Sequence, residues 1–521
     1  MVNSNKISAR NIFSHELSIP VFLAFFQLAL QMAFHENYGY FRDELYYIAC
    51  SNHLAFGYVD QPPLSIAILW LNRLILGDSL HALRFLPALS GAVVVLLAAL
   101  MARKLGGSKF AQGLAALSIV AAHGLIGHGK LFSMNPFDVL FWALAGYIVI
   151  NILNDNKPKY WILFGIVVGL GLMNKYSIGV MVIGLVAGLL LTRHRRLLTT
   201  VWFWVGTAIA AVIFLPHIVW QIAHDFPSLE FMRNATENKN VSLSVVDFLV
   251  GQIRDMNIFN ALLWLGGIYF YFTEQEGRYR PFGWMYIVVF IVMVAGNAKV
   301  YYLSAIYPIY FAGGAVLFEQ IAQKQSLNWL KPVFASLLVL VALIILPFAL
   351  PVLPVDKFIQ YQRALGLAPR AEERTAVTDL PQYYADQFGW KEMVDTVASV
   401  YKRLTPEEQS RCFIYVSNYG EAAAIDFFGK ELRLPNARCG HNNYWLWGPG
   451  EQTGEIAIIF GNSRNLEDNY ADFRRRWKQV ELVSTTNAKH CMPYENGRMI
   501  FICKGMNTTF QQLWPTERFY I

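Results

Sequence analysis

Eleven long apolar runs constrain the fold of this chain more than any other feature of its sequence. The 521 residues are 55% hydrophobic and only 15% charged, and a helix needs roughly 17–25 apolar residues to cross a bilayer. The chain is therefore predicted to form a membrane all-α polytopic bundle of about eleven spans, with broken or tilted helices where a run is short. The runs cover residues 17–34, 85–102, 110–122, 136–153, 160–173, 177–191, 198–220, 258–272, 281–295, 300–318 and 332–352.

Lysine and arginine are concentrated in every second loop between these runs. Short loops with such an excess belong in the cytoplasm. A plasma (inner) membrane protein with a cytoplasmic N-terminus is therefore predicted, and the intervening loops face outward. The net charge of +7 arises largely from this bias and does not indicate nucleic-acid binding. The basic residues are Lys6 and Arg10; Arg103, Lys104 and Lys109; Lys157 and Lys159; Arg193, Arg195 and Arg196; Arg278 and Arg280; Lys324 and Lys331.

Hydrophobicity ends at Pro354, which predicts two domains. Residues 1–354 are expected to form the transmembrane domain, and residues 355–521 a soluble extracytoplasmic α/β domain. Within this tail, the composition predicts a helix over 421–428 after an Asn-Tyr-Gly turn, an arrangement typical of a βα unit. The predicted strands cover residues 412–417, 455–460 and 498–503.

Cysteine placement agrees with an outer tail but leaves its redox state open. Cys50 lies in the first outer loop, and the other four cysteines all lie in the tail. An even set in one extracytoplasmic domain suits two disulfides, whereas four buried free thiols are the alternative. The four are Cys412, Cys439, Cys491 and Cys503.

Two adjacent carboxylates, Asp43 and Glu44, follow the first apolar run. They lie between aromatic residues and next to Arg42. A carboxylate at the edge of a low-dielectric region is suited to take a proton from a hydroxyl. We interpret the pair as catalytic, although two solvated charges bridged to Arg42 are the structural alternative.

The segment Tyr58-Val-Asp-Gln-Pro-Pro63 adds a third acid, Asp60, to the same outer loop. Asp60 is a further catalytic candidate, and Tyr58 and Gln61 are candidates for substrate binding. The two prolines also suit the start of a helix, for which Asp60 would be only a cap.

Another acid and two lysines lie in or near short outward turns. Asp138 opens an apolar run, and Lys175 and Lys299 interrupt others. Cations on this face, with Arg42, are predicted to hold the phosphate of an anionic lipid. Capping by Asp138 and snorkelling of the lysines are the alternatives.

Two histidines, His123 and His128, lie in a glycine-rich outward turn. Each is most simply a packed side chain. A divalent metal shared with Asp138 or Asp60 is the alternative, and no other cofactor is indicated.

At these residues the chain resembles the GT-C class of membrane glycosyltransferases, specifically the family-39 or PMT_2-type group. Protein mannosyltransferases and the aminoarabinose transferase of lipid A belong to this group. The resemblance covers roughly residues 17–320. Its motifs are Phe41-Arg-Asp-Glu-Leu-Tyr-Tyr47, Tyr58-Val-Asp-Gln-Pro-Pro-Leu64, Asn135-Pro-Phe-Asp138, Gly171-Leu-Met-Asn-Lys175 and Lys299-Val-Tyr-Tyr302.

The resemblance implies transfer of a sugar from a polyprenyl-phosphate donor to an acceptor hydroxyl, with inversion, at the outer face. The acceptor would be an envelope lipid, glycan or protein. By position in the motifs, Tyr301 and Tyr302 join the substrate-binding candidates. Many relatives have a basic residue where this chain has Gln61, which shifts the expected phosphate contact to the lysines or Arg42. A transporter or flippase of polyprenyl-linked lipids is the alternative function.

The tail resembles the outer domain of a bacterial subgroup through two elements. These are Asn418-Tyr-Gly-Glu-Ala422 and Gly440-His-Asn-Asn-Tyr-Trp-Leu-Trp-Gly-Pro449. The rings of Trp445 and Trp447 present flat faces that suit a saccharide, and His441, Asn442 and Asn443 offer hydrogen bonds. Packing within the α/β domain is the alternative use of the same side chains.

Overall fold

The computed structural model describes residues 17–155, 157–369, 373–376, 378–451, 454–462 and 464–521, so Lys6 and Arg10 lie outside the described residues. The chain divides into two compact units, each assembled from separate segments. The helical unit comprises Met1–Glu36, Leu76–Ile218 and Ser242–Leu353. The mixed unit comprises Asn37–Ile75, Val219–Val241 and Pro354–Ile521. The first outer loop therefore packs with the tail, although more than 270 residues separate them in sequence.

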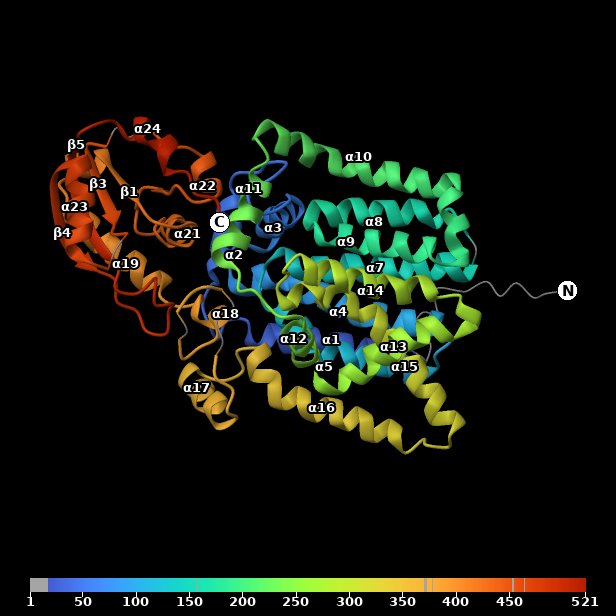
Figure 1. Ribbon diagram of the computed structural model, residues 1–521. Helices are drawn as coiled ribbons and strands as arrows, with labels where there is room; N and C mark the ends of the chain where they lie inside the picture. The colour runs from blue at the N-terminus through green and yellow to red at the C-terminus, as the bar shows by residue number, and fades with distance from the viewer. Residues whose placement is uncertain (1–16, 156, 370–372, 377, 452–453, 463) are drawn as a thin grey trace. The chain divides into compact units, whose positions relative to one another are not determined.

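Each of the eleven predicted apolar runs falls on a helix. Figure 1 shows several long helices of the helical unit lying alongside one another. The elements of this unit are α1 (Ser18–Phe34), α4 (Leu80–Lys104), α5 (Lys109–Ala121), α6 (His123–Gly129), α7 (Met134–Asp155), α8 (Tyr160–Asn174), α9 (Ser177–Leu190), η2 (Arg193–Thr199), most of α10 (Val201–Ala223), α12 (Val245–Asp255), α13 (Ile258–Thr273), η4 (Gln275–Gly277), α14 (Arg280–Ala295), η5 (Val300–Ile306), α15 (Tyr307–Lys324) and α16 (Leu330–Ala349).

The polytopic class is confirmed, and the number of spans stays a prediction. Among the described residues, five helices are long and apolar enough to cross a membrane. The number rises to seven if the bent pairs α5–α6 and α9–η2 each form one span. Four other predicted runs form apolar helices shorter than 18 residues, namely α1, α8, α13 and α14.

Small residues allow the closest helix contacts in this unit. A Cβ on Gly314 of α15 would lie 1.8 Å from the carbonyl oxygen of Leu263, and one on Gly267 of α13 would lie 2.1 Å from that of Tyr310. Any side chain at either position would push α13 and α15 apart. Membrane helices gain little from the hydrophobic effect against lipid, so such close backbone packing is a main source of their association.

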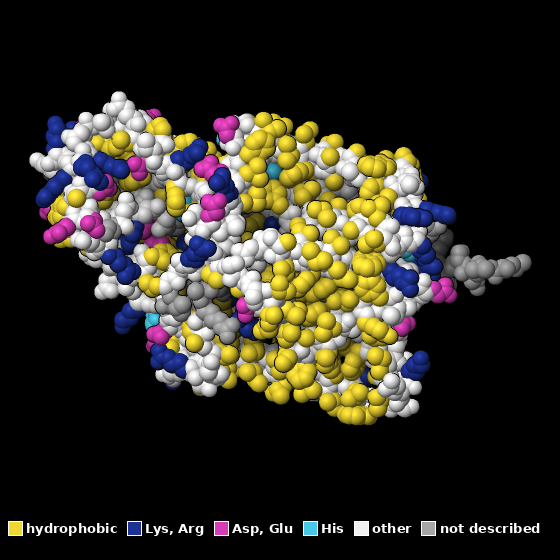
Figure 2. Space-filling model, in the orientation of Figure 1, with side chains coloured by type: hydrophobic (Ala, Val, Ile, Leu, Met, Phe, Trp, Pro, Cys, Tyr) yellow, Lys and Arg dark blue, Asp and Glu magenta, His cyan; other side chains and the backbone are white. Residues whose placement is uncertain are grey.

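The basic loops of the helical unit gather at one end of its helices. The Asn154 side chain donates to the carbonyl of Lys104, 2.9 Å away, and also accepts from Tyr279. Lys331 lies over the ring of Phe110 and Lys159 over that of Trp202. Figure 2 shows lysine and arginine at this end, next to a broad apolar surface over the helices. The spatial grouping agrees with the charge bias from which orientation was predicted.

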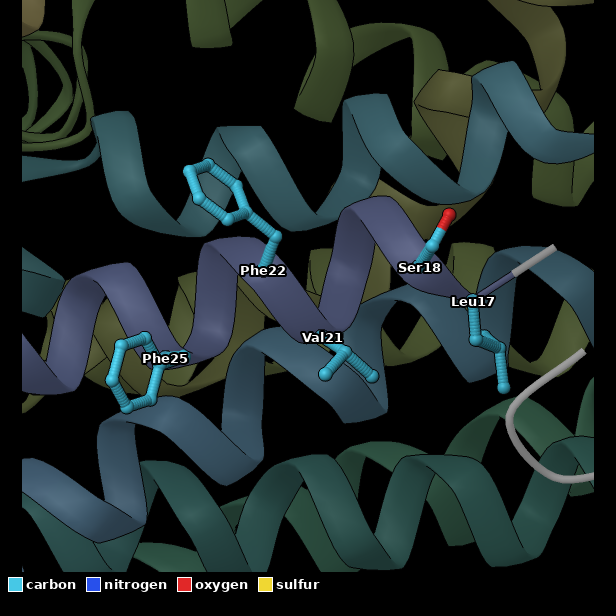
Figure 3. Close-up of a pocket in the computed structure, with 5 residues that line it drawn as sticks. All are labelled: Leu17, Ser18, Val21, Phe22 and Phe25. Carbon is cyan, nitrogen blue, oxygen red and sulfur yellow. The ribbon is translucent and has the colours of Figure 1, made fainter. Parts of the chain in front are cut away.

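The outer side of α1 carries a shallow apolar pocket of about 420 Å³ (Figure 3). Its side chains all come from one helix and its start, and Phe22 and Phe25 are 63% and 68% exposed. Binding sites for polar substrates need convergent polar groups, which this pocket lacks. We interpret it as lipid-facing surface. The lining residues are Leu17, Ser18, Val21, Phe22 and Phe25.

The mixed unit contains a five-stranded sheet in the order β2-β1-β3-β5-β4. Strands β2, β1 and β3 run parallel, whereas β5 pairs antiparallel with both β3 and β4. The three predicted strands and the predicted helix, α21 (Tyr419–Phe428), are confirmed, and β1–α21–β2 is the expected βα unit. Its strands are β1 (Cys412–Tyr415), β2 (Ala437–Arg438), β3 (Ile456–Phe460), β4 (Trp477–Thr485) and β5 (Met499–Met506).

The short β2 and the polar, amphipathic β4 were not predicted, because neither has the continuous apolar pattern of a buried strand.

The helices of the mixed unit are α2 (Arg42–Ser51), α3 (Leu64–Leu76), α11 (Pro227–Asn234), η3 (Ala235–Lys239), α17 (Val355–Ala364), α18 (Gln382–Ala385), α19 (Trp390–Tyr401), α20 (Pro406–Arg411), α21 (Tyr419–Phe428), α22 (Asn443–Leu446), α23 (Leu466–Arg476), α24 (Phe510–Leu513) and η6 (Trp514–Glu517).

All five cysteines are buried free thiols, so of the two alternatives left open by the sequence the structure shows free thiols and not two disulfides. The sheet explains part of this result. Cys412 on β1 and Cys503 on β5 are separated by strand β3. Two strand spacings of about 4.8 Å exceed the Cα separation of roughly 7 Å that a disulfide tolerates.

Candidate functional site

Helix α2 positions the first two acids at its N-terminus. Phe41 is extended, and the backbone N–H of Arg42 donates to the carbonyl of Asp386. The carboxylate of Glu44 accepts the N–H of Phe41 at 2.9 Å, and Glu44 is fully buried. This contact satisfies a backbone donor at the helix start, while the helix dipole favours both negative charges there.

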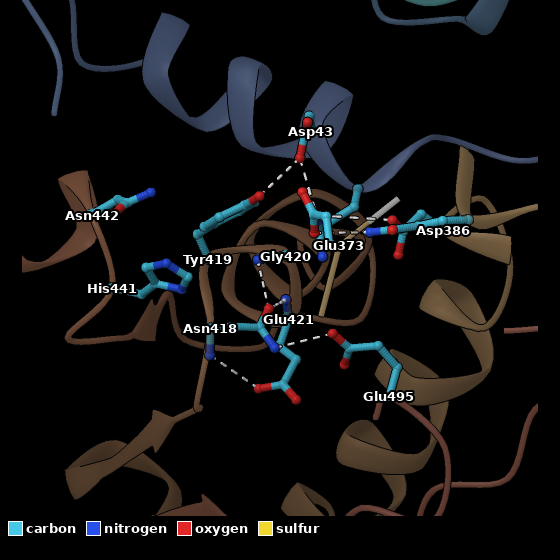
Figure 4. Close-up of polar contacts among 12 residues, drawn as sticks. Asp43, Glu373, Asp386, Asn418, Tyr419, Gly420, Glu421, His441, Asn442 and Glu495 are labelled. Carbon is cyan, nitrogen blue, oxygen red and sulfur yellow. Dashed lines mark hydrogen bonds and ion pairs between the residues drawn. The ribbon is translucent and has the colours of Figure 1, made fainter. Parts of the chain in front are cut away.

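Asp43 differs from Glu44 because 37% of its side chain is exposed. Figure 4 shows its carboxylate reaching the hydroxyl of Tyr419, which donates to Oδ1 at 2.9 Å. Arg42 Nε lies 3.5 Å from the same oxygen. Within the described residues both contacts fall on Oδ1 and none on Oδ2. One oxygen of Asp43 is thus held, and the other has no partner in the part of the chain that the structure describes.

Arg42 is bound by residues of the tail. Its Nη1 donates to the hydroxyl of Tyr494 at 2.6 Å, and its Nη2 lies 3.9 Å from Asp386. Only 12% of its side chain is exposed. The guanidinium carbon lies 5.4 Å from the ring centre of Tyr419. These contacts occupy much of the group that sequence reasoning assigned to a lipid phosphate.

Asp60 is partly buried and lies beside the same helix. Its Oδ1 accepts the hydroxyl of Tyr46 at 3.0 Å and the amide of Asn443 at 3.4 Å. Burial raises the pKa of Asp60 to about 6, although the Tyr46 hydrogen bond opposes the shift. The Tyr46 ring also lies 4.5 Å from that of Tyr419, so the surroundings of Asp43 and Asp60 are continuous.

Tyr58 and Gln61 lie in the turn around Asp60. The Tyr58 hydroxyl accepts the N–H of Ala55 and donates to the carbonyl of His53, both at 3.2 Å, which closes its own loop. Gln61 is 1% exposed, and neither its amide nitrogen nor its oxygen has a partner among the described residues. An unpaired buried amide costs about 1–3 kcal/mol. Gln61 therefore suits an external polar group, whereas Tyr58 is better explained as a loop contact.

A second cluster lies inside the helical unit, at the start of α7. Lys175 donates to the side-chain oxygen of Asn135 at 2.8 Å and lies 3.5 Å from Asp138. Ser177 donates to the other oxygen of Asp138 at 2.5 Å. The side chains of Asp138 and Lys175 are 4% and 11% exposed. These residues were each predicted from a separate motif, and the fold brings them together.

Aromatic residues of η5 complete this cluster. The Lys175 ammonium lies 4.7 Å from the ring centre of Tyr302 and 5.5 Å from that of Tyr301. Both distances suit cation–π contacts. Lys299 immediately precedes η5 and is half-buried. Lys175 is thus surrounded by an amide, a carboxylate and two aromatic rings.

The histidines of α6 do not form a metal site with these acids. His128 Nε2 lies 2.7 Å from the Ser304 hydroxyl, and His123 lies 3.9 Å from Asp255. No group of three or more His, Cys, Asp or Glu gathers as metal ligands in the part of the chain that the structure describes. A metal at this place would need ligands other than the predicted set.

Most of the predicted saccharide contacts of the tail serve internal packing. His441 Nε2 and the Asn442 amide both contact the carbonyl of Ile521. Trp445 and Trp514 each donate to the other's carbonyl at 3.0 Å. The Trp447 ring stacks on His53 at 4.2 Å, while Asn443 accepts the N–H of Val59 and donates to Asp60.

Sequence reasoning missed the tail residues that surround Asp43 and Arg42. These are Asp386, Tyr419 and Tyr494, which lie 344, 376 and 452 positions from their partners in the first outer loop. The motif that contains Tyr419 was recognised, but no local pattern links it to an acid so far away in the chain.

Comparisons with known proteins agree with this architecture. A family model described as dolichyl-phosphate-mannose-protein mannosyltransferase matches residues 60–220. The match includes Asp60, Gln61, Asp138 and Lys175, and it begins after Asp43.

Two curated proteins are similar over part of the chain. Lipid A galacturonosyltransferase RgtD of Rhizobium johnstonii is 23% identical over 274 residues, which are 50% of this chain and 56% of that protein. Undecaprenyl phosphate-alpha-4-amino-4-deoxy-L-arabinose arabinosyl transferase 1 of Pseudomonas fluorescens is 24% identical over 227 residues, 43% of this chain and 38% of that protein. The chain thus spans about half or less of the length of these relatives.

Solved structures support the fold over a larger share of the chain. ArnT from Cupriavidus metallidurans, bound to undecaprenyl phosphate, matches 95% of this chain and 98% of its own, with a TM-score of 0.57 and 13% identity. The oligosaccharyltransferase of Archaeoglobus fulgidus matches 81% of this chain and 64% of its own, with a TM-score of 0.51 and 13% identity. The fold class is that of the GT-C membrane glycosyltransferases. The predicted resemblance to their PMT_2-type group is confirmed.

Proposed function

We propose that this protein transfers a sugar from a polyprenyl-phosphate donor to an acceptor hydroxyl, at the outer face of the inner membrane and with inversion. The observation that carries the proposal is Asp43, a partly exposed carboxylate with one oxygen held and the other without a partner among the described residues. Support also comes from the relatives. One is named a lipid A galacturonosyltransferase, and the name of the other specifies an arabinosyl transferase for undecaprenyl phosphate-linked aminoarabinose.

In the proposed reaction, Asp43 Oδ2 takes the proton of the acceptor hydroxyl. The hydroxyl oxygen forms a bond to the anomeric carbon as the bond from that carbon to the phosphate oxygen breaks. Polyprenyl phosphate leaves with the electron pair of that bond. Positioned general bases of this kind contribute about 10²–10⁴-fold to rate.

Lys175 is the proposed contact for the donor phosphate. A buried ammonium held by Asn135, Asp138 and two tyrosine rings is oriented in advance, and a charge-assisted hydrogen bond to phosphate is stronger than a neutral one. Gln61, with its unpaired amide, is a further proposed contact to a polar group of a substrate.

The remaining two acids take different roles in this proposal. Glu44 stabilises the start of α2, since its carboxylate already accepts a backbone N–H. Asp60 titrates near neutral pH because burial raises its pKa to about 6, so it is the second choice for proton transfer. The flippase alternative has no comparable support, since the named relatives are transferases.

The test is transfer by the purified full-length protein in lipid nanodiscs. Undecaprenyl-phosphate donors carrying a hexuronic acid or an aminopentose are supplied separately with an envelope lipid acceptor. We expect one donor class to release undecaprenyl phosphate together with a glycosylated product, and the Asp43→Asn variant to lose both. Movement of the intact donor between leaflets without product would instead favour the flippase.

A further inference from the structure

The tail segment Asn418–Ala422 is arranged around Arg42 and Asp43 of the outer loop. Asn418 accepts the backbone N–H groups of Gly420 and Glu421 at 2.9 and 3.1 Å, which starts α21 at this point. Starting the helix there directs the Tyr419 hydroxyl to Asp43 Oδ1, as Figure 4 shows.

The two residues after Tyr419 maintain this arrangement. A Cβ on Gly420 would lie 2.6 Å from Cγ of Arg42, so a side chain there would displace Arg42. Glu421 is fully buried, with its carboxylate 3.0 Å from Arg498. This contact anchors α21 within the tail. In the motif Asn418-Tyr-Gly-Glu-Ala422, Gly420 thus leaves room for Arg42 and Glu421 fixes the helix within the tail.

Arg42 is held on its other side by two further tail residues. Tyr494 accepts from Arg42 at 2.6 Å and donates to Asp386 at 3.1 Å. Burial raises the pKa of Asp386, and the Arg42 charge opposes that shift. Burial, and less strongly the Asp43 carboxylate, raise the pKa of Tyr419 well above its usual value although Arg42 opposes them. Tyr419 therefore remains a phenol that donates its proton.

We propose that Tyr419 is a positioning residue for the transfer reaction, through which the C-terminal tail orients the Asp43 carboxylate. The hydroxyl holds Oδ1, which leaves Oδ2 directed to the acceptor hydroxyl whose proton it takes. The inference rests on the proposed function. The tail would then take part in catalysis through Tyr419, in addition to any binding of sugar by its tryptophans.

The test compares Tyr419→Phe with a matched control, Tyr415→Phe, in the full-length protein. Tyr415 also donates to a carboxylate, that of Glu517 at 2.5 Å, but it lies on β1, and among the described residues it makes no hydrogen bond to Arg42 or Asp43. We expect Tyr419→Phe to lower kcat about 5- to 30-fold with an unchanged KM for the donor. The control should keep the parental kcat.

A kcat of Tyr419→Phe equal to those of the parent and the control, in a protein that loses activity on Asp43→Asn, would overturn the inference and leave the proposed function intact. A parent that transfers no sugar from any polyprenyl-phosphate donor would overturn both. If Tyr419→Phe does not fold, Asn418→Ala decides the matter, because it removes the acceptor that starts α21 and places the Tyr419 hydroxyl. A parental kcat in this variant would refute the proposal.

Discussion

Asp43 and Glu44 are adjacent acids with different proposed roles, proton transfer and helix capping. Replacing each of them separately by its amide distinguishes these roles. Asp43→Asn keeps an oxygen that can accept the Tyr419 hydroxyl, and it loses only a partly exposed ion pair to Arg42 at 3.5 Å. Such pairs contribute about 1 kcal/mol or less. The thermal midpoint should therefore change little, while kcat falls about 10²–10⁴-fold through loss of the base.

Glu44→Gln is the matched control. A glutamine oxygen can still accept the N–H of Phe41, so both the fold and turnover should survive. Glu44→Ala removes the acceptor and should lower the free energy of unfolding by about 1 kcal/mol. The assay is the initial rate of polyprenyl phosphate release at saturating donor, paired with thermal unfolding of each variant.

Two results would refute the assignment of Asp43. The first is near-parental turnover by a folded Asp43→Asn protein, which would transfer the role of base to Asp60. The second is a Glu44→Gln variant as inactive as Asp43→Asn, since a residue that only caps a helix should tolerate that change.

Three further expectations concern the donor site, an acid with a shifted pKa, and topology. Lys175→Met should weaken binding of polyprenyl phosphate about 10- to 100-fold, and it should also destabilise the protein by leaving Asp138 without its cation. Adding Asp138→Asn should restore stability but not binding. Full binding of polyprenyl phosphate by the double variant would refute the contact. Burial raises the pKa of Asp60 in the folded protein to about 6 from 3.8, so its ionisation destabilises the fold as pH rises. The free energy of unfolding of the parent should therefore fall by up to about 3 kcal/mol between pH 4 and 7, relative to that of Asp60→Asn. The same dependence of unfolding free energy on pH in both proteins would contradict this. Protease added to intact spheroplasts should digest the tail, whereas digestion only after lysis would place it in the cytoplasm.

The sequence alone predicted the class of fold and most residues of the cluster around Lys175. An apolar run in a bilayer forms a helix whatever its neighbours are, because its backbone polar groups must be hydrogen-bonded within the segment. Strand β3 was likewise predicted from a continuous apolar run. In the helical unit, Asp138, Lys175 and Tyr302 were each singled out by motif, and the structure places Lys175 in contact with both of the others.

Long-range contacts could not be predicted in this way. An even number of tail cysteines suggested disulfides, but strand order decides which side chains meet, and β3 separates Cys412 from Cys503. Arg42 looked like a phosphate ligand in its local sequence, yet the tail residues Asp386 and Tyr494 contact it.

What the sequence by itself determined is the set of local properties: apolar periodicity, the charge bias of the loops, and the presence of three acids in one outer loop. Only the tertiary structure decided which acid is accessible. It buries Glu44 against the start of α2 and holds one oxygen of Asp43 with Tyr419, 376 positions away. The reason is physical: exposure and hydrogen bonding depend on which segments pack together, and in a folded chain those segments need not be neighbours in sequence.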